Sequence, residues 1–465
     1  MPRHAGAPPI TDMRTATTAL LHPNAVAVVG ASDDPRRTGG RLMLSLVQGG
    51  FRGPIHPIDE PEPGTSKVPS QVLAKRTLWS VTDLPEGVDL VVLTIGGDRA
   101  VALAAECVRK GVRAVMVPAA GFAEAHQRGR ELQMRLLDEV SFKGGRLLGP
   151  NSAGLYCASS ALDLAPGLGI AGKGPGSVAL LSQAGDLDHL FIDTLADHGL
   201  GLGLYVGLGN AADLGPQHLL AAAADEPGIK AIAVSVLGEV DHVALASAVR
   251  DVAPRVPVVI THKVRGRAAH RAARAHSGAA SDAADAVPDL ISAGAVIATD
   301  LVDLADKATA LALQPRARGR RVAILSTSSG AAVAAATHLE EQRLELPVMP
   351  EQVQRVLMQW LPEQGTAANP VHLGGALPDA SLKPVVEGVL GQSSVDGAVL
   401  LAVGTDQPAL ATATAEVVAR RGKPVVAVAI RAPRTGEALR AAGIPVYPSP
   451  LRAARAYQAL VPWPL

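Results

Sequence analysis

One histidine stands in a run of small residues, a pattern that could carry a covalently bound group. Residues 275–282 read AHSGAASD, with the histidine at position 276. An imidazole nitrogen is nucleophilic near neutral pH, and small neighbours leave a loop free to move. We therefore expect His276 to take up a group at one place and deliver it at another. Because the chain has 13 histidines, a surface or capping role is the alternative.

Loops that suit phosphate occur three times. Each follows an apolar strand-like run and precedes a helix-like run: Gly30-Ala31-Ser32, Ser182-Gln183-Ala184-Gly185 and Ser328-Ser329-Gly330. Backbone N–H groups at the start of a helix attract anions, and in parallel sheets such loops lie at the edge where ligands bind. The three loops therefore predict phosphate handling. The alternative for each is an ordinary turn, with Ser182 as the N-cap of the next helix.

The first loop lacks the full dinucleotide-binding fingerprint. The spacing from Gly30 to Gly39 is too long for the GxGxxG pattern. Asp59 and Glu60 do follow a short β-like run, Ile55 to Ile58. A nicotinamide-dependent oxidoreductase therefore stays open for this segment alone, although it leaves most of the chain unexplained.

The elements that must position these loops alternate between strand-like and helix-like runs, the pattern of parallel α/β domains. We expect a disordered leader over residues 1–19 and then three parallel-sheet domains, over 20–147, 148–314 and 315–465. A proline and a cluster of arginines at 314–321 are typical of a linker. Because the last two domains open alike, a weak internal duplication is predicted.

Composition excludes several classes of protein. The chain has 43 basic and 43 acidic residues and a formal net charge of zero, so nothing electrostatic favours nucleic acid or an anionic membrane as the main partner. Its two cysteines, Cys107 and Cys157, lack a second pair for a metal site and indicate a reducing cytoplasm. No signal peptide and no long apolar span is recognisable, and no metal site is expected.

The order of several short motifs resembles the nucleoside diphosphate-forming acyl-CoA synthetases, the superfamily of the succinyl-CoA synthetase α subunit and the ADP-forming acetyl-CoA synthetases. The resemblance extends from about residue 20 to the end of the chain. The motifs that carry it are VVGAS at 28–32, LPEGVDL at 84–90, GFAE at 121–124, GPN at 149–151, LSQAG at 181–185, LGNAAD at 208–213, LGEV at 237–240, the loop around His276, ANPV at 368–371 and AAGIPVY at 441–447.

The resemblance implies a Rossmann-like CoA-binding domain followed by two flavodoxin-like, succinyl-CoA synthetase-like domains. Complete single-chain members also carry an ATP-grasp domain, for which the 465 residues leave no candidate segment. The chain is therefore expected to be a cytoplasmic α-type subunit in a hetero- or homo-oligomer. An ATP-grasp β-type partner would bind ADP or ATP with Mg.

In this family, phosphate attacks acyl-CoA, and the resulting acyl phosphate passes its phosphoryl group to a histidine that carries it to ADP or GDP. The resemblance assigns that histidine to His276, and to Glu239 the glutamate that fixes the imidazole tautomer. It further implies a phosphate-binding set and a CoA-binding set. The first comprises Ser182, Gln183, Ala184, Gly185, Ser329 and Gly330, and the second Gly30, Ala31, Ser32, Arg36, Gly39, Gly121 and Asn151.

Departures from the family pattern cluster on the CoA side. Asp59 and Glu60 stand where the family has an Asn-Pro pair followed by a lysine, and Gly96-Gly97 where it commonly has proline. Two carboxylates should weaken attraction to the CoA phosphates. Arginines 36, 37 and 41 are the expected compensation. The alternative to an active ligase is a degenerate paralogue that binds CoA, acyl-CoA or a partner protein without catalysis.

Overall fold

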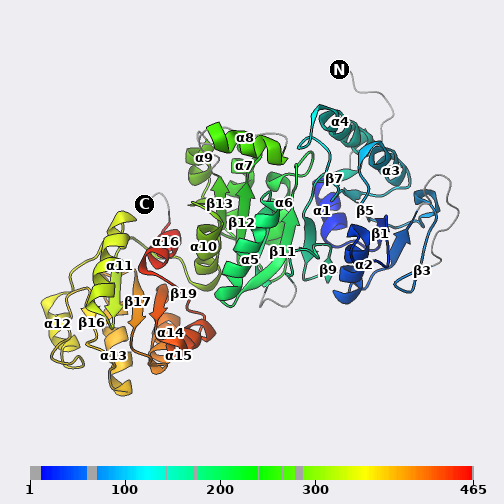
Figure 1. Cartoon of the computed structure of the whole chain (residues 1–465). Coiled ribbons are helices and arrows are strands. Elements are labelled where there is room, and N and C mark those ends of the chain that lie inside the picture. The colour runs from blue at the N-terminus through cyan, green and yellow to red at the C-terminus, as the bar shows by residue number, and fades with distance from the viewer. Residues whose placement is uncertain are drawn as a thin grey trace. The chain divides into compact units, whose positions relative to one another are not determined.

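The computed structural model describes residues 12–59, 71–142, 144–170, 176–238, 240–262, 267–277 and 286–462. Its backbone contacts divide the chain into two units. The first unit comprises Met1–Ile192 and Gly201–Leu301, and the second comprises Asp193–Leu200 and Val302–Leu465. Three large sheets are distributed over these units (Figure 1).

The first sheet is five-stranded and parallel throughout, in the order β2-β1-β5-β6-β7. Alternate residues of the interior strand β1 point to opposite faces of the sheet. Val26 and Val28 pack in one apolar cluster, and Ala27 and Val29 pack in another. Helices therefore cover both faces. The elements are β1 Val26–Val29, α2 Thr38–Gln48, β2 Ile55–Ile58, β5 Leu90–Leu93, α3 Gly97–Arg109, β6 Ala114–Met116, α4 Gln127–Phe142 and β7 Arg146–Leu148. A small hairpin, β3 Gln71–Val72 and β4 Lys75–Arg76, and the 3₁₀ turn η1 Val81–Asp83 lie between β2 and β5.

The second sheet has seven strands in the order β14-β13-β12-β10-β11-β8-β9. Five of them are parallel, while β8 and β9 add an antiparallel edge next to β11. The sequence patterns did not predict this edge. The elements are β8 Gly154–Cys157, β9 Leu162–Asp163, β10 Gly176–Ser182, η2 Gly185–Leu187, α5 Asp188–Asp197, β11 Gly201–Gly207, α6 Pro216–Asp225, β12 Ala231–Val236, α7 His242–Val252, β13 Val258–His262, α8 Arg267–Ser277, α9 Val287–Ser292, β14 Val296–Ala298 and α10 Leu301–Leu313.

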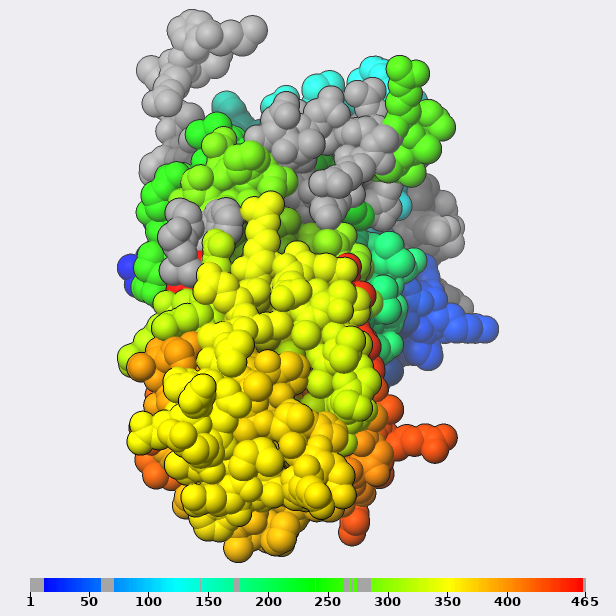
Figure 2. Space-filling view, turned by 90° about the vertical axis from the view of Figure 1, so that its left-hand side faces the viewer, coloured from blue at the N-terminus to red at the C-terminus, as the bar shows by residue number. Residues whose placement is uncertain are grey.

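The third sheet, in the second unit, is again five-stranded and parallel, in the order β16-β15-β17-β18-β19. Segments around α12 lie on the surface of the second unit and are drawn yellow in Figure 2. The elements are β15 Val322–Ser326, α11 Ser329–Glu341, α12 Glu351–Leu357, β16 Val371–His372, α13 Asp379–Leu390, β17 Gly397–Val403, α14 Ala409–Arg421, β18 Val425–Ile430, α15 Pro433–Ala441, β19 Val446–Tyr447 and α16 Pro450–Leu460.

All three sheets share one winding order. Numbered by their parallel strands alone, each runs 2-1-3-4-5. In such a sheet the chain leaves the first strand to one side and later returns to its other side, so a crevice forms at the carboxyl end of that strand. This switch in winding lies at the ends of β1, β10 and β15, where the three predicted phosphate loops stand.

Residues expected in the disordered leader form a helix instead. Helix α1, Met13–Leu21, begins at Asp12, whose side chain accepts the N–H of Thr15. Ala16, Ala19, Leu20 and Leu21 are buried on it. The sequence contains both the cap and the apolar spacing of this short helix, but the prolines and arginines around it suggested an unstructured segment. Residues 1–11 lie outside the described part of the chain.

The two sheets of the first unit share an apolar core and a buried ion pair. One continuous cluster joins residues of β1 and α2 to residues of β10, β11 and α6. Asp213 accepts three hydrogen bonds from the Arg146 guanidinium, two of them from Nε, and its carboxylate also accepts the N–H of Leu147 at 2.8 Å. Both charged side chains are largely buried. The end of β7 is thereby held against the second sheet.

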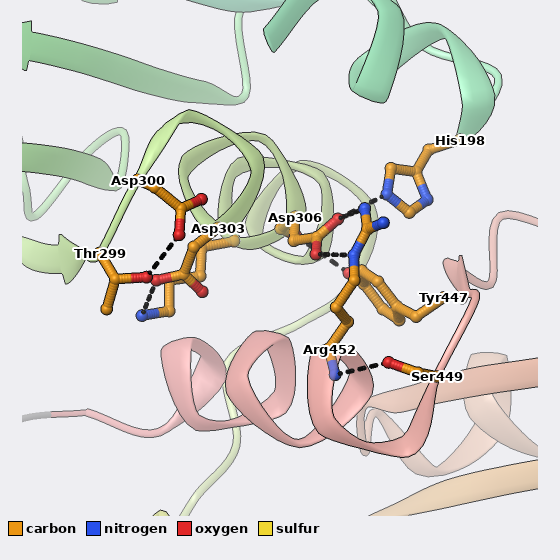
Figure 3. A network of polar contacts seen from close by, with 9 residues as sticks. His198, Thr299, Asp300, Asp303, Asp306, Tyr447, Ser449 and Arg452 are labelled. Carbon is orange, nitrogen blue, oxygen red and sulfur yellow. Dashed lines mark hydrogen bonds and ion pairs between the residues drawn. The ribbon is translucent and has the colours of Figure 1, made fainter. Parts of the chain in front are cut away.

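The second unit contains a buried polar network around Asp306 on α10 (Figure 3). Arg452 donates to the Asp306 carboxylate from Nε at 2.6 Å and from Nη2 at 2.7 Å, and His198 Nε2 lies 2.8 Å from it. The Tyr447 hydroxyl donates to the Asp306 carbonyl oxygen at 3.0 Å. The segment 193–200 is thus linked to α10, β19 and α16.

Candidate active site

A cavity of about 370 Å³ opens at the carboxyl end of β10. The segments after β6 and β7 contribute Glu124 and residues 151–153 to its wall. The turn after β10 and the one after β11 contribute the rest: Ser182, Gln183, Gly185, Asp186 and Gly209. Two of the predicted sites therefore meet here, because Asn151 was assigned to CoA and the turn at 182–185 to phosphate.

Ser182 makes its polar contacts inside its own turn. Its hydroxyl donates to the Asp188 carboxylate at 2.5 Å and accepts the N–H of Ala184 at 3.0 Å. The other Asp188 oxygen accepts the Tyr205 hydroxyl at 2.8 Å. All three side chains are buried, and burial, reinforced by the Asp188 charge, raises the pKa of the Tyr205 hydroxyl well above its ordinary value. The Ser182 hydroxyl proton thus already has a carboxylate partner.

The helix after this turn starts later than the sequence pattern predicts. A 3₁₀ turn occupies Gly185–Leu187, and α5 begins only at Asp188. A carboxylate in the first turn of a helix interacts favourably with the positive end of the helix dipole. Asp188 therefore already interacts with the positive end of the α5 dipole, which was predicted to attract phosphate. Asp186 is exposed and lines the cavity, adding a second negative charge.

Gln183 ties the turn to the segment that follows β12. Its Oε1 accepts the N–H groups of Leu237 at 3.2 Å and Gly238 at 3.1 Å, and its own N–H donates to the Ser235 carbonyl at 3.0 Å. The next residue along, Glu239, lies outside the described residues. Gln183 therefore fixes the backbone immediately before the predicted orienting carboxylate.

His276 lies on a helix rather than on a loop as far as the backbone is described. Helix α8 continues through Ser277, which places residues 275–277 in its last turn. The side chain of His276 and residues 278–285 lie outside the described part of the structure. Its approach to Glu239 remains a prediction.

Glu124 anchors the opposite wall of the cavity. Its Oε1 accepts the N–H of Gly121 at 2.5 Å and of Phe122 at 3.0 Å, and its Oε2 accepts Asn210 Nδ2 at 2.5 Å. Gly121 has φ +101°, in the region that favours glycine. Asn151 Nδ2 donates to Asn210 Oδ1 at 3.4 Å. Among the described residues, the cavity wall holds two carboxylates and no lysine or arginine.

The loop after β1 is closed onto the neighbouring strand. The N–H groups of Gly30 and Ala31 both donate to the Ile58 carbonyl, at 2.9 and 3.2 Å. A Cβ on Gly39 would lie 1.9 Å from the Gly30 oxygen, so only glycine lets α2 approach this loop. The Ser32 hydroxyl accepts the N–H of Asp34 at 3.1 Å. Because the N–H groups of Gly30 and Ala31 already donate to a carbonyl, this loop is less able to donate to a phosphate group than its sequence predicts.

Arg36 is engaged by a neighbouring carboxylate. It donates to Asp34 through Nε and Nη2, and this hydrogen bonding raises the pKa of the guanidinium. Arg41 Nη1 donates to the Arg36 carbonyl at 3.2 Å. Burial raises the pKa of Asp59, and the charge of Arg37 opposes that rise. Three arginines were predicted to offset the carboxylates that depart from the family pattern. Among them, Arg37 is the one whose charge acts on such a carboxylate, Asp59.

The remaining described residues that the sequence singled out do not line the cavity at β10. Gly96 precedes the first turn of α3, and Gly97 has φ +67°. Glu60 lies outside the described residues. Ser329 and Gly330 are exposed at the start of α11, after the cap that Ser328 makes to the N–H of Ala331. They belong to the second unit, so a phosphate site shared with the turn at 182–185 remains a prediction.

Comparison with known proteins places two regions in described families. Residues 24–154 match the CoA binding domain, and residues 175–311 match the succinyl-CoA ligase like flavodoxin domain. No helix among the described residues is both long and apolar enough to cross a membrane.

Similarity also extends over nearly the whole chain. The α subunit of acetate–CoA ligase [ADP-forming] I from Pyrococcus furiosus is 28% identical over 459 residues, which cover 96% of this chain and 97% of that one. Acetate–CoA ligase [ADP-forming] I from Archaeoglobus fulgidus is 27% identical over 95% of this chain, but over only 63% of its own longer chain. The solved acetyl-coenzyme A synthetase 1 of Ca. Korarchaeum cryptofilum, in complex with phosphate and ADP, is 26% identical with a TM-score of 0.84 and 96% of each chain covered.

Proposed function

Because this chain belongs to the superfamily of nucleoside diphosphate-forming acyl-CoA synthetases, we propose that it is the α-type subunit of an ADP-forming acid–thiol ligase. The reaction is acyl-CoA plus phosphate plus ADP giving a carboxylic acid, CoA and ATP, in either direction. One observation carries the assignment to this site: a single cavity joins Asn151 and Glu124, beside the CoA-binding sheet, to the turn after β10.

The first step places phosphate against the thioester at this cavity. A phosphate oxygen attacks the acyl carbonyl carbon, the C–S bond breaks, and CoA leaves as a thiol after taking up a proton. Glu124, which accepts the Gly121 N–H at 2.5 Å, and Asn151 line the cavity, and we place the reacting carbonyl beside them. Small, fixed polar groups of this kind position reactants without adding positive charge.

The second step transfers the phosphoryl group to His276. An imidazole nitrogen attacks phosphorus, and the acid leaves as its carboxylate. Glu239 holds the other ring nitrogen, which leaves the attacking nitrogen unprotonated and stabilises the positive charge that the ring gains as the N–P bond forms. Gln183 supports this arrangement because its side-chain oxygen holds the N–H groups of residues 237 and 238. The partner subunit, with an ATP-grasp domain and Mg-bound nucleotide, then takes the phosphoryl group onto ADP.

The proposal is tested by phosphorylation with γ-labelled ATP in the presence of an ATP-grasp partner. Wild-type chain should acquire an acid-labile, base-stable phosphoryl group. His276→Ala should acquire none, while His270→Ala, on the same helix, should be labelled like the wild type. Absence of label on the wild type with a partner shown to be competent would contradict the proposal.

A second candidate is a paralogue that binds CoA or acyl-CoA without turnover. The observation that favours it is the charge of the cavity: Asp186 lines it, Asp188 holds the Ser182 hydroxyl, and no basic side chain among the described residues lies in its wall. Calorimetry with CoA shows that the chain is competent to bind, and the labelling assay then distinguishes the two candidates. This paralogue would bind CoA but remain unlabelled by ATP, whereas the ligase would do both.

A further inference from the structure

Three potential metal ligands converge in the first unit, away from the cavity at β10. His22 follows the last turn of α1, Cys157 ends β8, and Glu226 follows α6. One imidazole nitrogen, the thiol sulfur and a carboxylate oxygen all lie within 4.8 Å of one another. His22 Nε2 is 2.6 Å from Glu226 Oε1, and Cys157 Sγ is 3.5 Å from Glu226 Oε2.

Burial makes this cluster chemically unusual. Cys157 is fully buried and Glu226 is 8% exposed. Within the described residues, the one ion pair of Glu226 is with His22, whose side chain is 41% exposed. A buried carboxylate is costly unless a full positive charge compensates it. The Glu226 carboxylate is compensated here by three groups: the titratable imidazole of His22, the Ser159 hydroxyl at 2.5 Å and the weakly donating thiol of Cys157.

We propose that His22, Cys157 and Glu226 bind one divalent ion of the zinc class. Nitrogen, thiolate sulfur and carboxylate oxygen together suit Zn²⁺, whereas Mg²⁺ and Ca²⁺ prefer oxygen alone. Binding breaks the S–H bond of Cys157, forms a metal–thiolate bond and releases one proton. Three protein ligands leave the fourth tetrahedral position to water.

The geometry requires only a small rearrangement. With metal–ligand bonds of about 2.0–2.3 Å, tetrahedral ligand atoms lie roughly 3.3–3.7 Å apart. The separation of 3.5 Å between Cys157 Sγ and Glu226 Oε2 already falls in this range, whereas His22 Nε2 contacts the other carboxylate oxygen, Oε1, and the ligand atoms as a set lie within 4.8 Å of one another. His22 and Glu226 must separate by about 1 Å, and the half-exposed His22 ring has solvent on one side. Burial is the largest cause that raises the pKa of the Cys157 thiol, hydrogen bonds with Ser159 and Ser160 oppose the rise, and the Glu226 charge adds to it. A bound cation offsets this barrier to losing the thiol proton.

The surroundings supply a cavity beside one ligand and a supporting contact to another. The cavity, of about 240 Å³, lies against His22 and is also lined by Asn24 and Asp89 and by two arginines, Arg14 and Arg113, whereas Cys157 and Glu226 do not line it. Ser159 donates to Glu226 Oε2 and so orients this ligand from outside. The ion would tie the end of α1 to β8 and α6. Its role is therefore structural and does not depend on the ligase reaction.

Cobalt(II) alone is the probe, added to the metal-free, full-length chain. We expect a near-ultraviolet thiolate-to-cobalt absorption band that saturates at one equivalent, is removed by Zn²⁺ and is unaffected by a large excess of Mg²⁺. Cys157→Ser and His22→Ala should abolish the band. Ser159→Ala should weaken cobalt binding by about 10–100-fold, the usual effect of losing a group that orients a ligand.

The matched control is Cys107→Ser, which removes the only other cysteine, a buried residue of α3. This variant should keep the full band. Circular dichroism confirms that each variant is folded. The proposal is overturned if folded wild-type chain gives no thiolate band, if Cys157→Ser retains it, or if the band depends on Cys107.

Discussion

The carboxylate of Asp188 lies 2.5 Å from the hydroxyl of Ser182, inside the turn whose sequence indicates a phosphate site. This contact removes the hydroxyl proton from the donors available to a ligand. It also places negative charge at the start of α5. The turn must therefore bind phosphate through its backbone and through groups brought by other segments.

Replacing Asp186 should strengthen binding of phosphate. This exposed carboxylate lines the cavity, and one unit charge at about 4 Å in water costs about 1 kcal/mol, or roughly fivefold in affinity. Asp186→Asn should therefore lower the half-saturating phosphate concentration about fivefold in the acyl-CoA-consuming direction. Asp251→Asn removes an exposed carboxylate of α7 that does not line the cavity and should change nothing. Equal effects of the two variants would refute a local role for Asp186.

Removing the Ser182 hydroxyl should destabilise the first unit. Ser182→Ala leaves a buried carboxylate with one fewer donor, which costs about 2 kcal/mol of unfolding free energy. Chemical denaturation monitored by circular dichroism measures the change. Ser177→Ala, on the same strand, is the comparison, because the Ser177 hydroxyl oxygen is buried without a hydrogen-bond partner among the described residues. If both variants unfold at the same denaturant concentration, the Ser182–Asp188 bond contributes nothing.

Acid should weaken the first unit through His218. Burial, and then the charge of Arg146, lowers the pKa of this histidine below its ordinary value of 6.5. Its Nδ1 accepts the N–H of Gly215 at 3.1 Å, which only the unprotonated nitrogen can do. The unfolded chain therefore binds the proton first, and the stabilisation is lost as the pH falls below 6.5.

The test compares unfolding midpoints between pH 7 and pH 5. His218→Gln should show a shallower loss of stability across this range than the wild type. The exposed His189 provides the control, since His189→Gln should leave the slope unchanged. A wild-type slope in His218→Gln would show that other groups account for the acid sensitivity.

Breaking the network around Asp306 should unfold the second unit more readily (Figure 3). The carboxylate is buried and takes two bonds from Arg452, so Asp306→Ala leaves a guanidinium without its partner and costs about 3–5 kcal/mol. Thermal unfolding measures the loss. The exposed Lys383–Glu416 pair is the control, and Glu416→Gln should leave the transition in place.

Arg37 should contribute more to CoA affinity than Arg36. Arg36 is already paired with Asp34, whereas Arg37 has no such ion pair among the described residues, and its charge opposes the rise in the pKa of Asp59, just after β2. Arg37→Ala should reduce CoA binding in calorimetry, and the reduction should shrink at high salt because screening weakens exposed charges. A larger loss in Arg36→Ala would reverse this assignment.

The alternation of apolar strands and amphipathic helices was enough to predict three parallel α/β sheets, since each buried run such as 26–29 or 322–326 is short and flanked by small residues. The antiparallel edge formed by β8 and β9 was missed because two short strands of four and two residues carry little periodicity. Helix α1 was missed for a different reason, because the prolines and arginines around it outweighed its cap and its apolar spacing.

The motif at 182–185 predicted a turn after a strand, and the structure has one there, but the motif did not predict the partners of Ser182. Asp188 stands three residues beyond Gly185 in the sequence, and an acidic residue so close to the turn is a signal for a carboxylate partner. Phosphate binding at this turn stays a prediction. The cluster of His22, Cys157 and Glu226 gave no such local signal. His22 and Glu226 are 204 positions apart, so only the packing of α1 on α6 brings them together.

The assignment of residues 193–200 to the second unit affects where the chain can be divided. A fragment beginning at Val302 would contain Asp306, Tyr447 and Arg452 but not His198. Such a fragment would expose a surface that the intact chain covers with residues 193–200, and it would be prone to aggregate. Studies that dissect this protein by truncation therefore need to graft this short stretch onto the fragment, or keep the chain whole.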